Sequence, residues 1–451
     1  MMNSADGYAE YLPFQRSELE ARKTPRVRAA LSAVVAFTTL SGAAGAQGAP
    51  RPTTEPTRLG FSVARLARVD SFLQRYVDDN LIAGAVGLVL RDGKVAYERA
   101  VGWSDKEAGR KMTADAMFRI ASQSKALTSV AILQLVEGGK IAISDPVSRF
   151  IPAFERTSVA VRADTGRVVV PAKRRITIRD LLTHTAGISY GTGQLVAPLY
   201  EAKGLGPAAG YGWYTADKNE PICETIERLA TLPFVAQPGE AWVYGYNTDI
   251  LGCVVERASG LPLDEYIRTR ITAPLGMKDT YFFVPPAQRE RLSAVYASDS
   301  TGHIKRAPDG PRGQGDYVDG PRRSYAGGAG IVSTARDYSL FLNAILNGGA
   351  ADGVRILSPH AVALMTTNMV GTLHAADGSL GFGLGFETTE KLGAKGLATV
   401  GTFGWGGAYS SIYMVDPKER LIIVFMVQLL PNGTDIGGKF PTLVYQALVD
   451  K

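Results

Sequence analysis

The feature that most constrains the fold of this chain is a β-hairpin signal near its N-terminal end. Two runs rich in apolar and β-branched residues, 84–90 and 95–101, flank the tetrapeptide Arg-Asp-Gly-Lys at 91–94. Asp-Gly between two such runs is a strong signal for a tight turn between antiparallel strands. Just ahead of the hairpin, apolar residues recur at helical spacing over 61–80. This spacing predicts an amphipathic helix.

Strand signals return near the C-terminal end of the chain. Three runs there have the composition of strands, and a final apolar segment has that of a helix: 400–404, 410–415, 421–428 and 434–449. The middle of the chain instead alternates long loops rich in Gly and Pro with short predicted helices at 178–183, 223–232, 248–258 and 263–271. In predicted secondary structure, the two ends of the chain therefore resemble each other more than either resembles the middle.

This order of elements predicts an α/β (α+β) fold in which one antiparallel sheet is flanked by helices. Residues 58–144 and 325–450 are expected to form that part together, with 145–324 as a mostly helical insertion. A chain of 451 residues has room for both parts, since a domain usually holds roughly 100–200 residues. A composition of 45% hydrophobic and 20% charged residues is typical of a soluble globular protein.

The mild positive charge of the chain does not indicate a nucleic-acid partner. The formal net charge is +6, and part of it comes from basic residues near the N-terminus. A second basic cluster lies among Gly, Pro and Asp residues, which is typical of a solvated loop: Lys305, Arg306, Arg312, Arg322 and Arg323. No known nucleic-acid recognition motif is present. The predicted partner is therefore a small molecule.

Residues 22–46 have the pattern of an export signal. A basic segment precedes the apolar run 29–40, and Ala44-Gly45-Ala46 offers a small-x-small cleavage site. The apolar run is shorter than the about 20 residues that a membrane-spanning helix needs. We expect residues 1–57 to be a signal peptide and linker, with cleavage after Ala46 and a periplasmic or secreted product. A cytoplasmic protein with a disordered N-terminus is the alternative.

The cysteines and histidines do not form a recognisable metal or disulfide framework. Cys223 and Cys253 are the two cysteines, and we expect separate buried thiols, with a single bridge as the alternative in an oxidising compartment. The four histidines are widely scattered and show no metal-binding spacing. No metal and no cofactor is predicted.

Ser122-Gln-Ser-Lys125 is the first candidate for chemistry. It lies at the start of a largely apolar predicted helix, 126–137. Side chains at i and i+3 share one helical face, with about 5–6 Å between their Cβ atoms. A serine becomes a nucleophile when a base takes its proton, and an amine can do so. A helix cap followed by a surface lysine is the alternative, but the apolar helix leaves Lys125 no obvious exposed face. Ser124 is excluded as nucleophile because the residue three positions on is Leu127.

Two other segments have the letters of known motifs without their setting. Gly187-Ile-Ser189-Tyr-Gly191 reads G-x-S-x-G, but a nucleophile elbow needs a strand before the serine and a helix after it. A helix precedes Ser189 here and a loop follows, so a turn is the better interpretation. The glycines of 381–385 approach a nucleotide-loop pattern, but no βαβ unit surrounds them.

Two downstream segments gather polar and aromatic residues. Trp242-Val-Tyr244-Gly-Tyr246-Asn247 stands at the start of an apolar helix, and helix-end packing is the alternative to a site. Trp405-Gly406-Gly407-Ala408 stands among the C-terminal strand signals. Its adjacent glycines would allow a ligand or another segment of backbone to approach closely, although a tight turn explains them equally well.

In combination, these segments resemble the serine β-lactamase and penicillin-binding-protein superfamily, specifically the class C-like branch that includes family VIII carboxylesterases. The resemblance covers most of residues 60–450. Ser122-Gln-Ser-Lys125 is similar to the S-x-x-K motif of that superfamily, and the segments 176–188 and 328–337 resemble signatures of the branch. Tyr244 matches the tyrosine motif in its esterase-like form, with Gly245 in place of a serine.

The resemblance implies a role for each motif. Ser122 would be the nucleophile, and Lys125 and Tyr244 would share the work of general base and acid. Backbone N–H groups of Ser122 and Ala408 would hold the oxyanion. Residues at the walls of the site would be Trp405, Gly406, Gly407, Tyr246 and Asn247. The family's asparagine falls at Tyr246, with Asn247 one residue late.

The third motif directs the prediction towards esters. β-Lactamases of the family usually have K-T-G where this chain has Trp405-Gly406-Gly407, the form seen in esterases of the branch. Without that lysine, the charge that would hold a β-lactam carboxylate is lost. We expect a serine carboxylesterase acting on short acyl chains. The alternatives are a β-lactamase or D,D-peptidase, an amide hydrolase, an acyltransferase, and a non-catalytic sensor.

Overall fold

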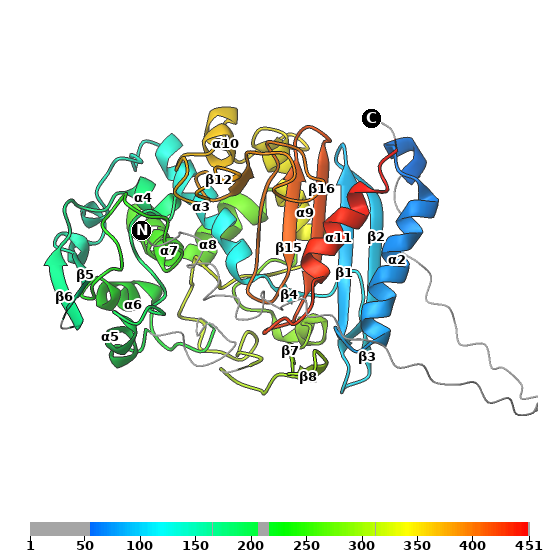
Figure 1. Cartoon of the computed structure of the whole chain (residues 1–451), viewed down its shortest axis with the longest axis horizontal. Coiled ribbons are helices and arrows are strands. Elements are labelled where there is room, and N and C mark those ends of the chain that lie inside the picture. Colours follow the sequence, from blue (N-terminus) through cyan, green and yellow to red (C-terminus); the bar gives the residue numbers. More distant parts are fainter. Residues whose placement is uncertain (1–54, 165, 206–215, 312, 450–451) are drawn as a thin grey trace, which may run out of the picture.

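The computed structural model describes residues 55–449 except 165, 206–215 and 312. An antiparallel sheet of eight strands runs through the molecule (Figure 1). From one edge to the other, its strands are β12 (Leu380–Phe382), β13 (Glu387–Thr389), β14 (Phe403–Gly406), β15 (Ile412–Asp416), β16 (Leu421–Val427), β1 (Gly84–Arg91), β2 (Lys94–Asp105) and β3 (Arg110–Lys111).

The predicted hairpin is confirmed and forms one half of the sheet. Strands β1 and β2 pair from Gly84↔Gly102 to Arg91↔Lys94. Asp92 and Gly93 between them have φ angles of 51° and 72°. Both angles are positive, as a tight turn that matches the twist of the flanking strands requires. The sequence Asp-Gly therefore fixes this turn.

The two ends of the chain meet at the centre of the sheet. β1 pairs with β16 over its length, with Leu88 opposite Val424. Both strands are buried throughout, so alternate side chains enter two different cores. Val89, Ile423 and Phe425 belong to the core under the outer helices, whereas Leu88 and Val424 belong to the larger core on the opposite face. The predicted fold class is thus confirmed.

Helices cover both faces of the sheet. On one face lie α2 (Val63–Asp78), which begins at its N-cap Ser62, and α11 (Ile436–Tyr445) (Figure 1). On the other lie α9 (Ala335–Leu346) and α3 (Ser124–Glu137). α3 is buried nearly all round, as its apolar sequence predicts, because it lies between the sheet and the middle of the chain.

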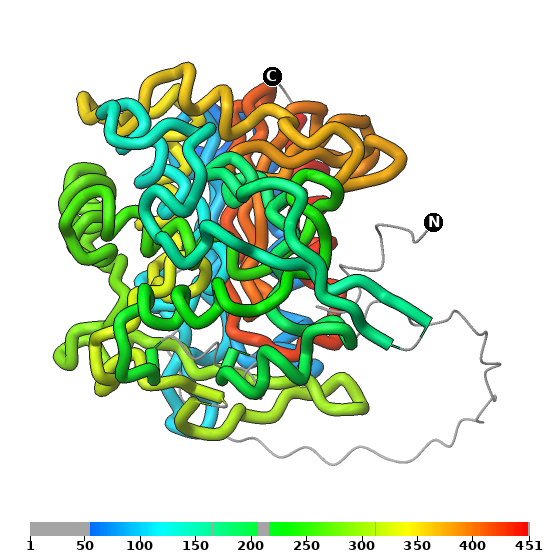
Figure 2. Tube along the Cα trace, turned by 90° about the vertical axis from the view of Figure 1, so that its left-hand side faces the viewer, coloured from blue at the N-terminus to red at the C-terminus, as the bar shows by residue number. Residues whose placement is uncertain are grey.

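The middle of the chain contains mostly short helices. They are η3 (Val147–Arg149), η4 (Pro152–Phe154), α4 (Ile178–Leu182), α5 (Ala197–Ala202), α6 (Ile222–Leu229), α7 (Asn247–Ser259), α8 (Leu263–Ile267), η5 (Arg268–Thr272) and η6 (Pro286–Arg291). It also contains two hairpins, β5–β6 (Ser158–Ala163, Gly166–Pro171) and β7–β8 (Tyr296–Ser298, Ile304–Arg306). The first hairpin projects at the edge of the molecule (Figures 1 and 2). The short strands β4 (Phe118–Arg119) and β9 (Val332–Ser333) pair with each other, as do β10 (Ala350–Ala351) and β11 (Val354–Arg355), which precede α10 (Pro359–Thr366).

Two predictions about local structure are corrected. The expectation of two separate thiols is wrong, because Cys223 and Cys253 form a disulfide with a Cα–Cα distance of 5.1 Å. The bridge is possible because α6 and α7 pack side by side, which the sequence did not reveal. The strand predicted at 400–404 begins instead at Phe403, because Gly401 adopts a φ of 90° in the preceding turn.

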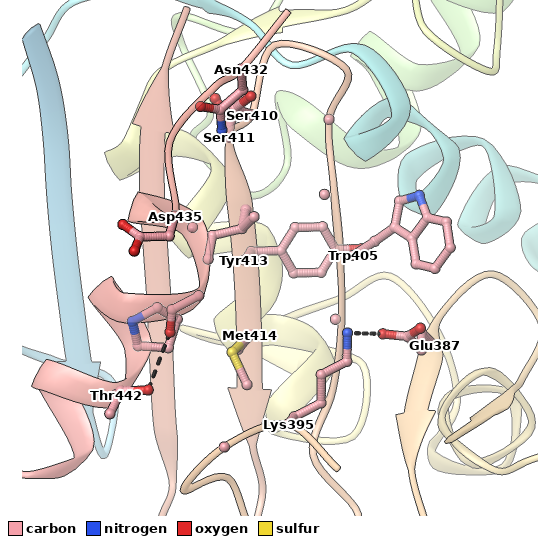
Figure 3. A pocket seen from close by; sticks show the side chains of 18 of the residues that line it. Glu387, Lys395, Trp405, Ser410, Ser411, Tyr413, Met414, Asn432, Asp435 and Thr442 are labelled. Carbon is pink, nitrogen blue, oxygen red and sulfur yellow. Dashed lines mark hydrogen bonds and ion pairs between the residues drawn. The ribbon is translucent and has the colours of Figure 1, made fainter. Parts of the chain in front are cut away.

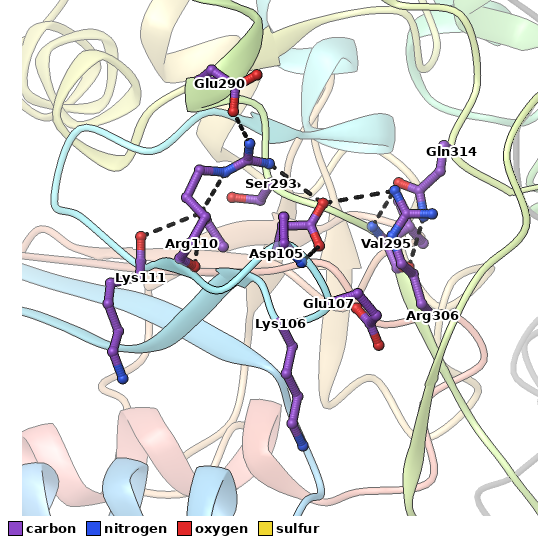
Figure 4. A network of polar contacts seen from close by, with 12 residues as sticks. Asp105, Lys106, Glu107, Arg110, Lys111, Glu290, Ser293, Val295, Arg306 and Gln314 are labelled. Carbon is purple, nitrogen blue, oxygen red and sulfur yellow. Dashed lines mark hydrogen bonds and ion pairs between the residues drawn. The ribbon is translucent and has the colours of Figure 1, made fainter.

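A polar network joins the edge of the sheet to the middle of the chain (Figure 4). Asp105, at the end of β2, accepts from Arg110 at 3.5 Å and lies 3.7 Å from Arg306. Arg110 also pairs with Glu290. The side chain of Asp105 is only 11% exposed, so these partners take the place of water around its carboxylate. Within the described residues, no helix is long and apolar enough to cross a membrane.

Candidate active site

Ser122 lies in a short helical turn, η2 (Ala121–Gln123), that leads into α3. It is not the cap of α3, because Gln123 occupies that position. The turn follows β4 directly, and Ile120 N donates to Ile331 O at 3.0 Å. Ala121, just before the serine, has a φ of 43°, which is uncommon for a residue with a side chain and typical of functional turns. Ser124 is a structural residue, since its Oγ accepts from Ile331 N at 3.1 Å.

Lys125 is buried in the first turn of α3 and faces Ser122. Its Nζ lies 3.2 Å from Ser122 Oγ, so the two side chains share a face as their spacing predicts. The same Nζ donates to Gly328 O at 2.7 Å. The buried carboxylate of Asp249 is linked to Lys125 through Gly328, because Gly328 N donates to Asp249 at 3.0 Å. Burial raises the pKa of Asp249, and the Lys125 charge opposes that rise.

Tyr244 lies beside Lys125 on the loop before α7. Lys125 Nζ is 4.7 Å from the centre of the Tyr244 ring. The phenol oxygen accepts a hydrogen bond from Trp405 Nε1 at 3.2 Å. The structure therefore brings together the two motifs on either side of α7, although about 160 residues separate Tyr244 from Trp405 in the chain.

Aromatic rings hold Tyr244 in place from two sides. Trp242 stacks on it at a centroid distance of 5.8 Å and an interplanar angle of 13°, and His184 lies 4.9 Å away. Burial and the charge of Lys125 hold the pKa of His184 well below its ordinary value, so this imidazole is neutral. His184 lies within the 176–188 segment, which thereby supplies a packing partner for Tyr244.

A second tyrosine, Tyr190, was not predicted to belong to the site. Its hydroxyl lies 2.9 Å from Lys125 Nζ, and its ring packs edge-on against Tyr244 at 5.6 Å. The G-x-S-x-G letters draw attention to the neighbouring Ser189 instead. Ser189 Oγ accepts from Gly191 N at 3.1 Å, which is the turn that the sequence favours. The sequence feature that could have identified Tyr190 as a site residue is its position two residues after the 176–188 segment.

The turn after β14 packs against the residue that precedes Ser122. At Gly407, a Cβ atom would lie 2.5 Å from Ile120 O and 3.7 Å from Ala121 Cβ. Only glycine permits this approach. Gly407 N donates to Ser411 O at 2.7 Å, and Ser410 N donates to Gly407 O at 2.8 Å. This tight turn holds Ala408 near the nucleophile turn, in the region where its backbone N–H is predicted to hold an oxyanion.

Comparisons with known proteins place this arrangement in a family. The sequence profile of the Beta-lactamase family matches residues 69–442. The chain belongs to the β-lactamase family. It is similar to Esterase EstB of Burkholderia gladioli, with 31% identity over 396 residues, which cover 84% of this chain and 94% of that protein. It is also similar to Protein Rv1367c of Mycobacterium tuberculosis, with 35% identity over 80% of this chain and 89% of that protein.

A solved structure is similar over the same region. It is EstCE1, described as a hydrolase with promiscuous acyltransferase activity, and the TM-score is 0.72 with 28% identity. The match covers 86% of this chain and all of that chain. The protein is therefore a serine hydrolase of the β-lactamase superfamily, in the branch that resembles family VIII esterases.

Two residues predicted at the walls of the site are buried and make structural contacts. Tyr246 is buried, and its hydroxyl donates to Leu205 O at 2.9 Å. Asn247 is fully buried; its amide nitrogen donates to Val243 O at 3.1 Å and lies 2.9 Å from His184 Nδ1. The helix α7 starts at Asn247, so this residue anchors the loop that carries Tyr244. Asn247, one position after the place of the family's asparagine, is thus the first residue of α7.

The described residues contain no cluster of His, Cys, Asp or Glu suited to a metal ion.

Proposed function

We propose that this serine hydrolase cleaves carboxylic esters through an acyl-enzyme on Ser122. The observation that carries the proposal is the 3.2 Å contact between Ser122 Oγ and Lys125 Nζ, in a part-buried site that also contains Tyr190 and Tyr244. At that distance an amine can take the serine proton as the oxygen attacks a carbonyl. The similarity to Esterase EstB supports the choice of esters.

In the first half of the reaction, Ser122 Oγ bonds to the ester carbonyl carbon and its proton passes to Lys125. The negative charge on the carbonyl oxygen is held by the backbone N–H groups of Ser122 and Ala408. When the tetrahedral intermediate collapses, the bond to the alcohol oxygen breaks. That oxygen takes its proton from Tyr244, and Lys125 returns a proton to Tyr244. An acyl group then remains on Ser122.

In the second half, water releases the acyl group. Tyr244 and Lys125 together take a proton from the water as its oxygen attacks the acyl carbon, and Ser122 recovers its proton when the bond to its Oγ breaks. Tyr190 also faces Lys125 Nζ, at 2.9 Å. Its role in this scheme is to fix the amine between the two hydroxyls that exchange protons with it.

An ester fits the site better than a β-lactam. Trp405 stands in the third motif, and its indole N–H is directed to the Tyr244 hydroxyl. A neutral indole provides no charge to hold the carboxylate of a β-lactam. We therefore propose weak or absent β-lactamase activity. A preference for short acyl chains is a separate part of the proposal, which a panel of esters tests.

The same site could pass the acyl group to an alcohol in place of water. One observation favours keeping this as a second candidate: the similar solved hydrolase EstCE1 is described as having promiscuous acyltransferase activity. Measuring hydrolysis in the presence of a short alcohol separates the two outcomes, because transfer forms a new ester where hydrolysis forms an acid.

A panel of p-nitrophenyl esters of increasing chain length tests the main proposal. We expect turnover to be highest for the shortest acyl chains and to be abolished by Ser122→Ala. Ser189→Ala is the matched control, since Ser189 lies in a turn and should leave turnover unchanged. Labelling with a fluorophosphonate should modify Ser122. Loss of activity in Ser189→Ala with activity retained in Ser122→Ala would overturn the scheme.

We also propose that the protein is exported and cleaved after Ala46. The disulfide between Cys223 and Cys253 supports this proposal, because such bonds persist mainly in oxidising compartments. N-terminal sequencing of the mature protein from a periplasmic or secreted fraction should begin at Gln47. Recovery of a mature protein that keeps residues 22–46 would contradict it.

A further inference from the structure

Three ionisable side chains contact one another next to the aromatic rings that surround Tyr244. Lys395 Nζ lies 2.5 Å from Glu387 Oε1, and His374 Nε2 lies 2.8 Å from Glu387 Oε2. Figure 3 shows Lys395 reaching Glu387 beside the strand that carries Trp405. The carboxylate therefore uses one oxygen for the lysine and the other for the histidine. We refer to Lys395, Glu387 and His374 as the relay.

The relay runs from the surface into the interior. The side chain of Lys395 is 40% exposed, whereas those of Glu387 and His374 are 8% and 3% exposed. Lys395 and Glu387 also line a cavity of about 520 Å³ along β14, from which the outer end of the relay can be reached. Burial raises the pKa of Glu387, but Lys395 and His374 outweigh burial and hold it below its usual value. Glu387 is thus a buried charge that depends on both partners.

The inner end of the relay lies against the rings around Tyr244. His374 packs edge-on against Trp242 at 4.4 Å and is 6.5 Å from Trp405. Trp242 stacks on Tyr244, and Trp405 donates to its hydroxyl. Each of the two tryptophans therefore lies between His374 and Tyr244.

The backbone adds a second connection. Glu387 lies opposite Gly404 in the β13–β14 pair, and Gly404 directly precedes Trp405. A shift of Glu387 would therefore act on Trp405 through the strand as well as through His374.

We propose that Lys395, Glu387 and His374 are positioning residues that hold Trp242 and Trp405, and through them Tyr244, in the geometry of proton transfer. This inference rests on the proposed function, because Tyr244 is the proton donor in that scheme. Displacing a reacting group by about 1 Å can reduce a rate about 100-fold. A half-buried tyrosine held largely by neighbouring rings is sensitive to such displacement. When Glu387 loses its charge, the relay no longer fixes the His374 ring, and the tryptophans lose a rigid neighbour.

The test compares Glu387→Gln and Lys395→Met with two controls. Lys395→Arg keeps the cation and should restore the wild-type rate. Lys391→Met removes a nearby lysine that donates to Asp377 O instead of to Glu387, so it should change nothing. The measurements are kcat and KM with a p-nitrophenyl ester, the melting temperature, and the near-UV circular dichroism of the tryptophans.

We expect kcat to fall about 10- to 100-fold in Glu387→Gln and Lys395→Met, with KM changed by less than about 3-fold. The near-UV signal should change in the same two variants. A lower melting temperature with unchanged kcat would overturn the inference and leave the relay a structural ion pair. If Glu387→Gln does not fold, the kinetics of Lys395→Met decide whether the inference holds, because the side chain of Lys395 is partly exposed.

Ser122→Ala separates this inference from the proposed function. If that variant is inactive while Glu387→Gln and Lys395→Met keep full activity, the relay inference alone fails. If Ser122→Ala is active, the proposed function fails, and a lower kcat in the relay variants no longer supports a role through Tyr244.

Discussion

Two tyrosines lie close to one lysine, and the contacts of their hydroxyls differ. Tyr190 OH lies 2.9 Å from Lys125 Nζ, whereas the Tyr244 hydroxyl accepts from the indole of Trp405. Tyr244 also lies with its ring centre 4.7 Å from Lys125 Nζ, so it adjoins both the amine and the third motif. The two residues are therefore expected to contribute unequally.

Replacing each tyrosine by phenylalanine measures this difference. We expect Tyr244→Phe to lower kcat about 100- to 10,000-fold, the range for loss of a general acid or base. Tyr190→Phe removes one hydrogen bond of Lys125 and should cost about 10-fold, since one neutral hydrogen bond contributes about 0.5–1.5 kcal/mol. Steady-state kinetics with a p-nitrophenyl ester checks both. Tyr246→Phe is the control, because its hydroxyl faces Leu205 O. Equal losses in the first two variants would contradict the division of roles.

Glycine at 407 is required by one close approach. A Cβ atom there would lie 2.5 Å from Ile120 O, so Gly407→Ala must push the β14–β15 turn away from the nucleophile turn. We expect kcat to fall about 100-fold, because Ala408 moves with it. Gly438→Ala is the matched control, since nothing lies within 4 Å of a Cβ atom at that position. Full activity in Gly407→Ala would show that Ala408 does not hold the oxyanion.

At the scale of single elements, the start of α6 depends on a carboxylate just before it. Glu220 accepts from both terminal nitrogens of Arg228, at 2.6 and 2.7 Å, and from Thr225 Oγ1 at 2.6 Å. These bonds, led by those of Arg228, lower the pKa of Glu220 from 4.5 to about 2. The folded state therefore binds a proton less readily than the unfolded state does.

This shift predicts how stability depends on pH. A group with a lower pKa in the folded state stabilises the protein fully above its unfolded value of 4.5, and that contribution is lost as the pH falls towards about 2. We expect Glu220→Gln to lower the melting temperature at pH 6 but to match the wild type near pH 2. Calorimetry at several pH values checks this. A constant difference between the two proteins over that window would contradict it.

The sequence predicts features that depend on residues close together in the chain, and it misses features that depend on residues far apart in the chain. The Asp92-Gly93 turn, the buried helix α3 and the shared face of Ser122 and Lys125 follow from local spacing. The place of Tyr190, the Cys223–Cys253 bridge and the relay do not. Each of these pairs residues from different elements, and their contact depends on how helices and strands pack.

The resemblance to a known family extended the prediction beyond local spacing. It associated Tyr244 and the Trp405 segment with Ser122, and the structure brings these segments together. At Tyr246 and Asn247 the chain departs from the family's pattern, and the part of these residues in the site stays a prediction. Both side chains are buried and donate to backbone carbonyls at the point where α7 begins.

At the scale of the whole molecule, the network around Asp105 holds the sheet against the middle of the chain (Figure 4). Asp105 forms ion pairs with Arg110 and Arg306 and accepts a hydrogen bond from Ala108 N. Removing one partner of a largely buried ion pair leaves the others uncompensated, which costs about 3–5 kcal/mol. We expect Asp105→Ala to lower the free energy of unfolding by up to that amount, measured in urea. Asp309→Ala is the control, since Asp309 pairs with Arg306 but is 84% exposed. Equal effects would contradict the importance of burial.

The pairing of β1 with β16 has a consequence for how the protein is made. Leu88 lies opposite Val424, so the centre of the sheet lacks a strand until nearly the whole chain has left the ribosome. Until then, β1 and β2 expose apolar faces that later become two cores. A chain in that state is open to aggregation until the C-terminal strands are made.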